Sequence, residues 1–89
     1  MMPDSKKIIR VIQVFDKTTD QLVKKIILNN QKFKLIKNII VAYEGDINYY
    51  EYYEIKKRHY NTTVMLIPVL QKYPLRAFEI YFGSQYILE

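Results

Sequence analysis

Two apolar runs separated by a short polar segment lie near the start of the chain, and they restrict its possible folds more than any other feature. The runs occupy 8–15 and 22–28, and both are rich in β-branched residues. The segment between them, 16–21, contains no apolar side chain. This pattern predicts two antiparallel strands, near 7–15 and 22–28, joined by a tight turn. Asp20 can close that turn in the left-handed conformation, because its short side chain bonds neighbouring amides.

A hairpin of this kind is only marginally stable alone, so the remaining chain must cover it. Both strands carry apolar residues on both faces, which predicts cover on at least part of each face. The chain has 89 residues and is 49% hydrophobic, so we expect a single domain over 1–89 with one core. Phe15, Ile36 and Phe78 are predicted to be buried in that core, and 1–5 to be a loose N-terminal segment.

A helix is predicted directly after the hairpin. Asn29 or Asn30 can cap its first turn, since an asparagine side chain accepts a bond from a free amide there. Apolar residues then recur at spacings of three and four as far as Tyr43, and Gly45 is a suitable stop. The β-branched residues at 39–41 suit a strand equally well.

The segment 47–55 contains four tyrosines, and tyrosine favours the pleated surface of a sheet. A strand here would place Tyr49 and Tyr53 on one face and Tyr50 and Tyr52 on the other. The first pair is then either core or interface, and the second pair is the one expected to be exposed.

The next segment leaves two alternatives open. The triplet Asn-Thr-Thr at 61–63 is a second capping signal, and apolar residues follow it at helical spacing. Pro68 would kink a helix over 62–73, because it removes a backbone hydrogen bond beyond the first turn. A short or broken helix therefore fits, and a strand over 63–67 that forms a hairpin with the tyrosine-rich segment is the alternative.

Alternation of apolar and polar residues over 76–82 predicts the last strand, with a turn at Gly83-Ser84 and a short tail at 85–89. The element order is therefore ββαβαβ. We expect a small α+β domain in which the N-terminal antiparallel hairpin belongs to a mainly antiparallel sheet packed with two helices.

The chain has 14 lysine and arginine residues against 9 acidic ones, a formal charge of +5. That excess suits an acidic partner, either a nucleic acid or an acidic protein surface, but it also keeps a small apolar domain in solution. The lysines form scattered pairs and match no groove-reading motif, so we expect only weak nucleic-acid binding.

Composition also bears on location. The chain has no cysteine, which excludes disulfides and suits a reducing compartment. No segment approaches the roughly 20 apolar residues of a membrane span, and the N-terminus lacks the apolar run of a signal peptide. We therefore expect a cytoplasmic protein without membrane contact.

The residue types in this chain give little support for a catalytic function. The single histidine, His59, follows three cations at 56–58 and is expected to be solvated. The carboxylates at 44–54 lack the spacing of a calcium loop, and pairing with lysines is their expected role. With only two glycines, the chain has no glycine-rich phosphate-binding loop. We predict no catalytic residue, no metal site, no cofactor and no enzyme activity.

The tyrosine-rich segment is the strongest candidate for a binding surface. Tyrosine gives a large contact area at low entropic cost and is enriched in protein interfaces. We predict that Tyr50 and Tyr52 bind a partner together with Lys56, Lys57 and Arg58. The same residues would alternatively stack and pair with single-stranded RNA.

Three short motifs resemble those of a family of small bacterial domains. An aromatic-Asp-Lys, Thr, acidic-Leu-Val pattern matches 15–23, a Tyr-Glu-Ile step matches 53–55, and an aromatic final strand matches 77–82. The chain departs from the pattern at Pro68 and in its tail. Such domains resemble the immunity proteins encoded beside secreted toxins, including those of contact-dependent growth inhibition systems.

The resemblance implies a function without chemistry. It implies a non-enzymatic inhibitor that stays in the cytoplasm, binds one cognate toxin domain and neutralises it. A basic protein would suit an acidic toxin surface, because complementary charge speeds the encounter. The alternative class is a small basic RNA- or DNA-binding module that uses lysine and tyrosine.

Overall fold

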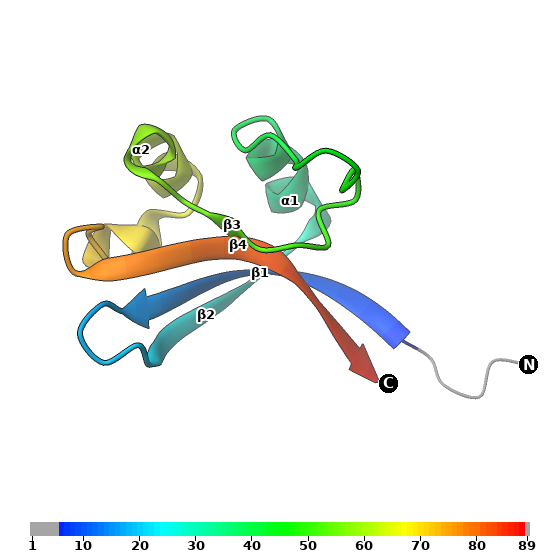
Figure 1. Ribbon diagram of the computed structural model, residues 1–89. Helices are drawn as coiled ribbons and strands as arrows, with labels where there is room; N and C mark the ends of the chain where they lie inside the picture. The colour runs from blue at the N-terminus through cyan, green and yellow to red at the C-terminus, as the bar shows by residue number, and fades with distance from the viewer. Residues whose placement is uncertain (1–5, 89) are drawn as a thin grey trace, which may run out of the picture.

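The computed structural model describes residues 6–88, which form a four-stranded sheet with two helices on one side (Figure 1). The elements are β1, Lys6–Asp16; β2, Leu22–Leu28; α1, Asn30–Lys37; β3, Tyr53–Glu54; α2, Lys57–Leu66; the 3₁₀ helix η1, Pro68–Lys72; and β4, Phe78–Leu88. The expected α+β class and ββαβαβ order are confirmed. The loose segment expected at 1–5 lies outside the described residues. No helix within 6–88 is long and apolar enough to cross a membrane.

The sheet has the order β2-β1-β4-β3, and all neighbouring strands are antiparallel. Its centre is the pair β1 and β4, which stay paired from Lys6 opposite Leu88 to Asp16 opposite Phe78. β2 forms one edge, and the two-residue strand β3 forms the other. The predicted hairpin is therefore part of the sheet, but the last strand rather than β3 lies beside β1.

The turn of the hairpin follows the prediction. Asp20 has φ 60, in the left-handed region. One carboxylate oxygen of Asp16 accepts hydrogen bonds from the amides of Thr18 and Thr19, so the polar segment satisfies its own backbone.

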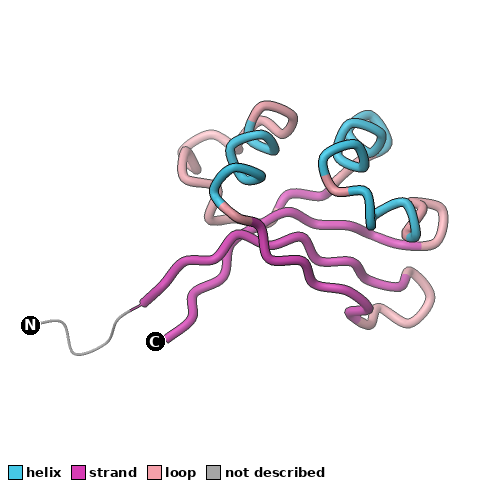
Figure 2. Tube along the Cα trace, turned by 180° about the vertical axis from the view of Figure 1, so that it is seen from behind, coloured by secondary structure: helices cyan, strands magenta, loops and turns pink. Residues whose placement is uncertain are grey.

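The two faces of the sheet have different surroundings. Ile12 and Val14 of β1 and Phe82 of β4 are fully buried in the core with Ile36 of α1. The opposite face carries neither helix, as the front and back views both show (Figures 1 and 2). Both helices therefore pack on one side of the hairpin, and on its other face only part of the hairpin is buried, at Val11.

The predicted core is confirmed only in part. Ile36 is fully buried. Phe78 is half-buried and packs against the rim of the core, where its ring meets Tyr73 edge to face at 5.1 Å. Phe15 is half-buried on the helix-free face, and its ring contacts Tyr81 at 5.9 Å.

Helix α1 has the predicted start but an earlier end. The Asn29 side chain accepts from the Lys32 amide at 2.8 Å, as a helix cap does. The helix ends at Lys37 rather than near Gly45. The β-branched residues 39–41 follow directly, and they favour extended backbone over a further helical turn.

The sequence left helix and strand open for 62–73, and the structure contains helix there, first α2 and then η1. Helix α2 begins at Lys57, five positions before Thr62, and ends at Leu66. Pro68 then opens η1, so the helix is broken at the proline as expected, since proline is tolerated in a first helical turn. The predicted cap at 61–63 is therefore wrong.

Strand β4 is longer than predicted. It runs without a turn through Gly83 and Ser84 as far as Leu88. A β-carbon on Gly83 would lie 2.2 Å from the Tyr52 ring, so glycine here makes room for that ring. The predicted turn and the tail as far as Leu88 are thus strand, because pairing with β1 continues past Gly83 and Ser84.

Candidate functional site

The tyrosine-rich segment is mostly a loop rather than the predicted strand. Only Tyr53 and Glu54 pair with β4, and Tyr49 has φ 57, which turns the chain. The carboxylate of Asp46 holds this turn by accepting from the amides of Tyr50 and Glu51 at 2.9 and 3.0 Å. A sequence pattern of period two cannot reveal such a side-chain-to-backbone turn.

Tyr49 and Tyr53 are core residues, which resolves the alternative left open by the sequence. They are 6% and 2% exposed, respectively. The Tyr49 hydroxyl donates to the Ile40 carbonyl at 2.7 Å. The Tyr53 hydroxyl donates to the Asp46 carboxylate and accepts from the Tyr43 amide. Both polar tips are therefore bonded within the protein.

The contact between Tyr53 and Asp46 shifts the pKa of both groups. Burial, reinforced by the hydrogen bond to Asp46, raises the pKa of the Tyr53 hydroxyl to about 12. The hydrogen bond from Tyr53, with the two backbone amides, holds the pKa of Asp46 below its usual value. The loop is thus fixed by a carboxylate that stays ionised at neutral pH.

Tyr50 and Tyr52 are exposed as predicted, at 42% and 40%, but they do not share a surface. Tyr50 lies on the helix side, where its ring contacts Tyr86 and the guanidinium of Arg10. Tyr52 covers Gly83 on the helix-free side. The turn at Tyr49 breaks the alternation that would have aligned them.

The predicted basic residues lie at the start of α2. Lys56 occupies the capping position, without a capping side-chain bond, and Lys57 and Arg58 begin the helix. The first turn contains no acidic residue. The helix dipole and these cations therefore add to a positive potential at this end.

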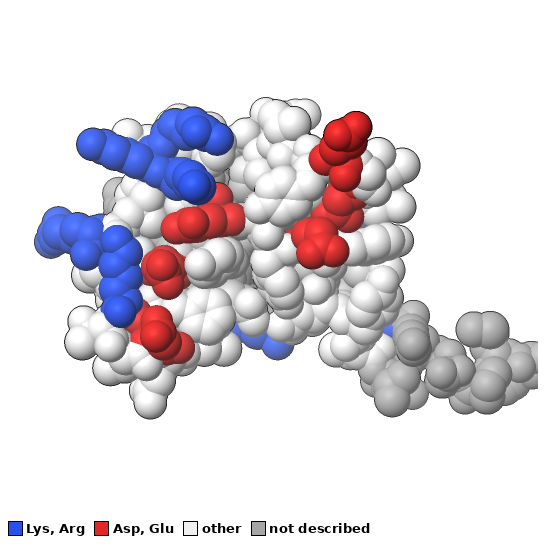
Figure 3. All heavy atoms as spheres, in the orientation of Figure 1, with Lys and Arg blue, Asp and Glu red and all other residues white. Residues whose placement is uncertain are grey.

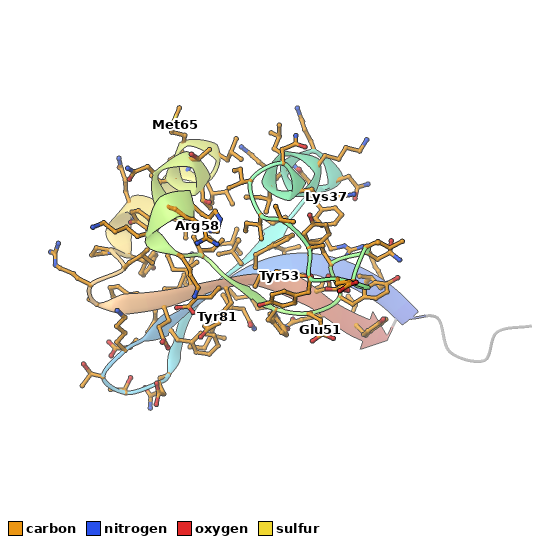
Figure 4. All side chains as sticks on the ribbon, turned by 45° about the horizontal axis from the view of Figure 1, so that its top comes forward. Lys37, Glu51, Tyr53, Arg58, Met65 and Tyr81 are labelled. Carbon is orange, nitrogen blue, oxygen red and sulfur yellow. The ribbon has the colours of Figure 1, made fainter. Side chains whose placement is uncertain are left out.

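A groove of about 310 Å³ lies beside this helix start. Lys56, Arg58 and His59 line it from the α2 side, and Val41 and Tyr43 line it from the loop after α1. Figure 4 shows Arg58 on α2 above Tyr53 of β3. Val41 and Tyr43 are 86% and 55% exposed. The groove therefore combines exposed apolar side chains with cations and with the carboxylate of Glu54.

The floor of the groove is aromatic. The rings of Tyr43 and Tyr53 stack with their centroids 4.2 Å apart and an interplanar angle of 25°. Tyr43 is held at its amide as well, through its bond to the Tyr53 hydroxyl. This exposed ring is thus rigidly placed, which lowers the entropy it would lose on binding.

His59 lines the groove as a half-buried helical residue rather than a solvated one. Burial, with Arg58 and Lys56 nearby, lowers its pKa, so its ring is neutral at pH 7. Its Nδ1 atom is buried without a hydrogen-bond partner in the described structure. The prediction of a solvated histidine is wrong, because 56–59 form a helix start rather than an outward loop.

Sequence reasoning therefore found part of this surface. Lys56 and Arg58 were predicted and line the groove, whereas Tyr50, Tyr52 and Lys57 do not line it. Val41 and Tyr43 were missed, because the helical spacing assigned Tyr43 to the buried stripe of a longer helix. Within residues 6–88, no cluster of three or more potential metal ligands occurs.

One family model matches residues 9–73, described as a domain of unknown function, DUF7683. The chain belongs to the DUF7683 family. The match extends over the DUF7683 chain from β1 to just beyond η1 and includes every residue that lines the groove. No curated protein and no solved structure matches the chain.

Proposed function

We propose that this DUF7683 protein is a non-enzymatic protein-binding inhibitor, an immunity protein that binds and neutralises a cognate bacterial toxin domain in the cytoplasm. The observation that carries protein binding is the groove beside α2, where exposed apolar and cationic side chains meet. The resemblance of the short motifs to immunity proteins supplies the toxin as the partner.

The shape and chemistry of the groove support a protein partner. Tyr43 is an exposed, rigidly held ring of the kind enriched at interface hot spots. Val41 and Ile47, on the same loop, are 86% and 79% exposed. A loop that leaves such side chains in solvent is typical of an interaction surface.

The charges favour an acidic region of the partner. Figure 3 shows basic side chains gathered over and beside α2, acidic side chains over the loop between α1 and β3, and further acidic side chains directly below the basic group. An acidic segment of a toxin would pair with Lys56 and Arg58, while the acidic loop would repel a nucleic acid laid along the same side. This arrangement supports a protein partner over RNA or DNA.

The test uses the protein encoded immediately upstream of this chain, since immunity genes usually follow their toxin. We expect that protein to arrest growth when expressed alone and to be harmless when co-expressed with this chain. The two purified proteins should form a stable complex in size-exclusion chromatography. An upstream product that arrests growth whether or not this chain is present, or that forms no complex with it, contradicts the proposal.

Variants of the groove test the binding surface. Replacing Tyr43 with alanine removes the predicted anchor and should weaken binding by about 2 kcal/mol, or about thirtyfold in Kd. Arg58→Glu should also weaken it, while Lys72→Glu, the same charge change on η1 outside the groove, should have little effect. Isothermal titration gives the affinities, and circular dichroism confirms that each variant is folded.

Two outcomes would require a different binding surface or a different function. Unchanged affinity of both groove variants would place the interface elsewhere, and the α1 lysines Lys32, Lys34 and Lys37 would be tested next. RNA binding can be measured by fluorescence anisotropy with labelled oligonucleotides. We expect only weak, nonspecific binding, with an affinity that falls steeply as the salt concentration rises. Submicromolar, sequence-selective binding near physiological salt would favour the nucleic-acid alternative.

A further inference from the structure

The helix-free face of the sheet is a second surface, which meets the groove only at Glu54 on the β3 edge. Large apolar side chains remain exposed on it, among them Ile27 at 63%, Leu22 at 47%, Ile87 at 41% and Tyr52 at 40%. Along each strand, side chains that point into the core alternate with side chains that point to the helix-free face. The strand pairing gives these exposed side chains the second kind of position. An apolar sheet face of this kind is stable in water when another layer covers it.

Two neighbouring rows across this face have a definite order. In one row, Ile27 of β2 pairs with Val11 of β1, Val11 with Gly83 of β4, and Tyr52 covers Gly83 at the β3 edge. The row therefore has a large exposed apolar side chain at each end, while Val11 and Gly83 between them are already buried.

The next row carries charges at its ends. Lys25 pairs with Gln13, Gln13 with Tyr81, and Tyr81 with Glu54. Lys25 and Glu54 are both exposed. Glu54 also helps to raise the pKa of the Tyr81 hydroxyl, after burial and Glu79, which agrees with its place on this face. The row thus runs from a cation at the β2 edge to a carboxylate at the β3 edge.

A second copy of the same chain complements this pattern. A two-fold axis parallel to the central strands, between two such faces, places β2 of one copy over β3 of the other. Lys25 then lies over Glu54 of the second copy, twice by symmetry, and Ile27 lies over Tyr52. Two sheets stacked in this way stand about 10 Å apart with strands within about 30° of each other.

We propose that the helix-free face is a homodimer interface, in which two sheets pack face to face with Lys25 of each copy paired with Glu54 of the other. Of the residues that line the groove beside α2, only Glu54, at the β3 edge, belongs to this interface. The dimer is argued from the sheet face and does not rest on the toxin-binding function.

The first experiment measures self-association of the full chain by sedimentation equilibrium over a range of concentrations. We expect a monomer–dimer equilibrium. Lys25→Glu and Glu54→Lys should each raise the dimer dissociation constant by about tenfold or more, because each change sets two like-charged pairs face to face. Lys34→Glu, on α1, makes the same charge reversal on the helix side and should leave the equilibrium unchanged.

Mixing the two single variants provides the decisive control. In the mixed dimer, the glutamate introduced at position 25 of one chain would face the lysine introduced at position 54 of the other. The unchanged Glu54 of the first chain would face the unchanged Lys25 of the second, so both pairs become attractive again. We expect the mixture to associate as the wild type does, although each variant alone associates more weakly. A change in the fold of either variant cannot produce this rescue.

An apolar variant tests the neighbouring row. Ile27→Lys should also raise the dimer dissociation constant by about tenfold or more, whereas Met65→Lys, on α2 and 80% exposed, should not. Figure 4 shows Met65 pointing away from the sheet. A wild-type chain that is monomeric at every concentration up to millimolar, or a dimer that survives both charge reversals and fails to distinguish these variants, would overturn the proposal.

Discussion

The two faces of the sheet are built from the same strands and similar residues, yet helices cover one face and not the other. On the helix side, Ile12, Val14, Ile80 and Phe82 are fully buried beneath α1 and α2. On the other side, Val11 is also fully buried, but Ile27 is 63% exposed and Phe15 is half-buried. Burial on the helix side comes from other elements of the chain, and burial on the helix-free side comes from neighbouring side chains of the sheet itself.

This difference separates folding from association. Side chains on the helix side release their apolar surface from water when the chain folds, so they contribute to the free energy of unfolding. Side chains on the helix-free side release much less, and the remainder is available to a partner. The helix-free face is therefore where a residue can be changed with a small effect on folding and a large effect on association.

The largest expected effect comes from a matched pair of phenylalanines. Phe82→Ala should lower the free energy of unfolding by about 3–5 kcal/mol, because it opens a cavity in the closed core. Phe15→Ala should cost about half as much, since its ring is half-buried and outside the core cluster. Urea denaturation monitored by circular dichroism gives both values. Equal losses for the two variants would break the distinction between the faces.

A smaller effect is expected at Tyr53, where the core meets the groove. Tyr53→Phe should cost about 1–2 kcal/mol, because the Tyr43 amide and the Asp46 carboxylate each lose a hydrogen-bond partner. The stacked ring of Tyr43 should become mobile, which can be followed in the aromatic NMR signals.

The same variant has a signature in its pH dependence. The pKa of Tyr53 is raised to about 12 in the folded protein, so the folded state holds this proton more tightly than the unfolded chain. Its contribution is therefore fully present below the usual tyrosine pKa of about 10 and is lost as the pH rises through about 12. Wild type should lose stability relative to Tyr53→Phe over that window, and parallel pH profiles would contradict this role.

The smallest expected effect is at Gly83, on the helix-free face. Gly83→Ala should cost about 1 kcal/mol, because a β-carbon there would clash with the Tyr52 ring. In a Tyr52→Ala background, where the ring is gone, the same change should be neutral or slightly stabilising. Thermal melts of the four chains of this double-mutant cycle measure the coupling. The same cost in both backgrounds would show that Tyr52 is not what requires glycine.

Much of the fold was predictable because it depends on local patterns. The hairpin, its Asp20 turn and the Asn29 cap each arise from neighbouring residues, through strand propensity, a side-chain bond or a left-handed residue. The exposure of Tyr50 and Tyr52 was also predicted, although for a reason that the structure does not support. Lys56 and Arg58 were predicted as part of a binding surface and lie in the groove.

The sequence by itself determined the α+β class, the element order and the long first hairpin, because periodicity and turn chemistry act over a few residues. The tertiary structure alone decided which face the helices cover, that β4 continues through Gly83, and that Asp46 turns the tyrosine-rich segment into a loop. Each of these depends on residues that are distant in sequence, such as β1 pairing with β4 and Tyr52 lying over Gly83. Such contacts leave no local pattern, since their energy arises only when separate elements meet.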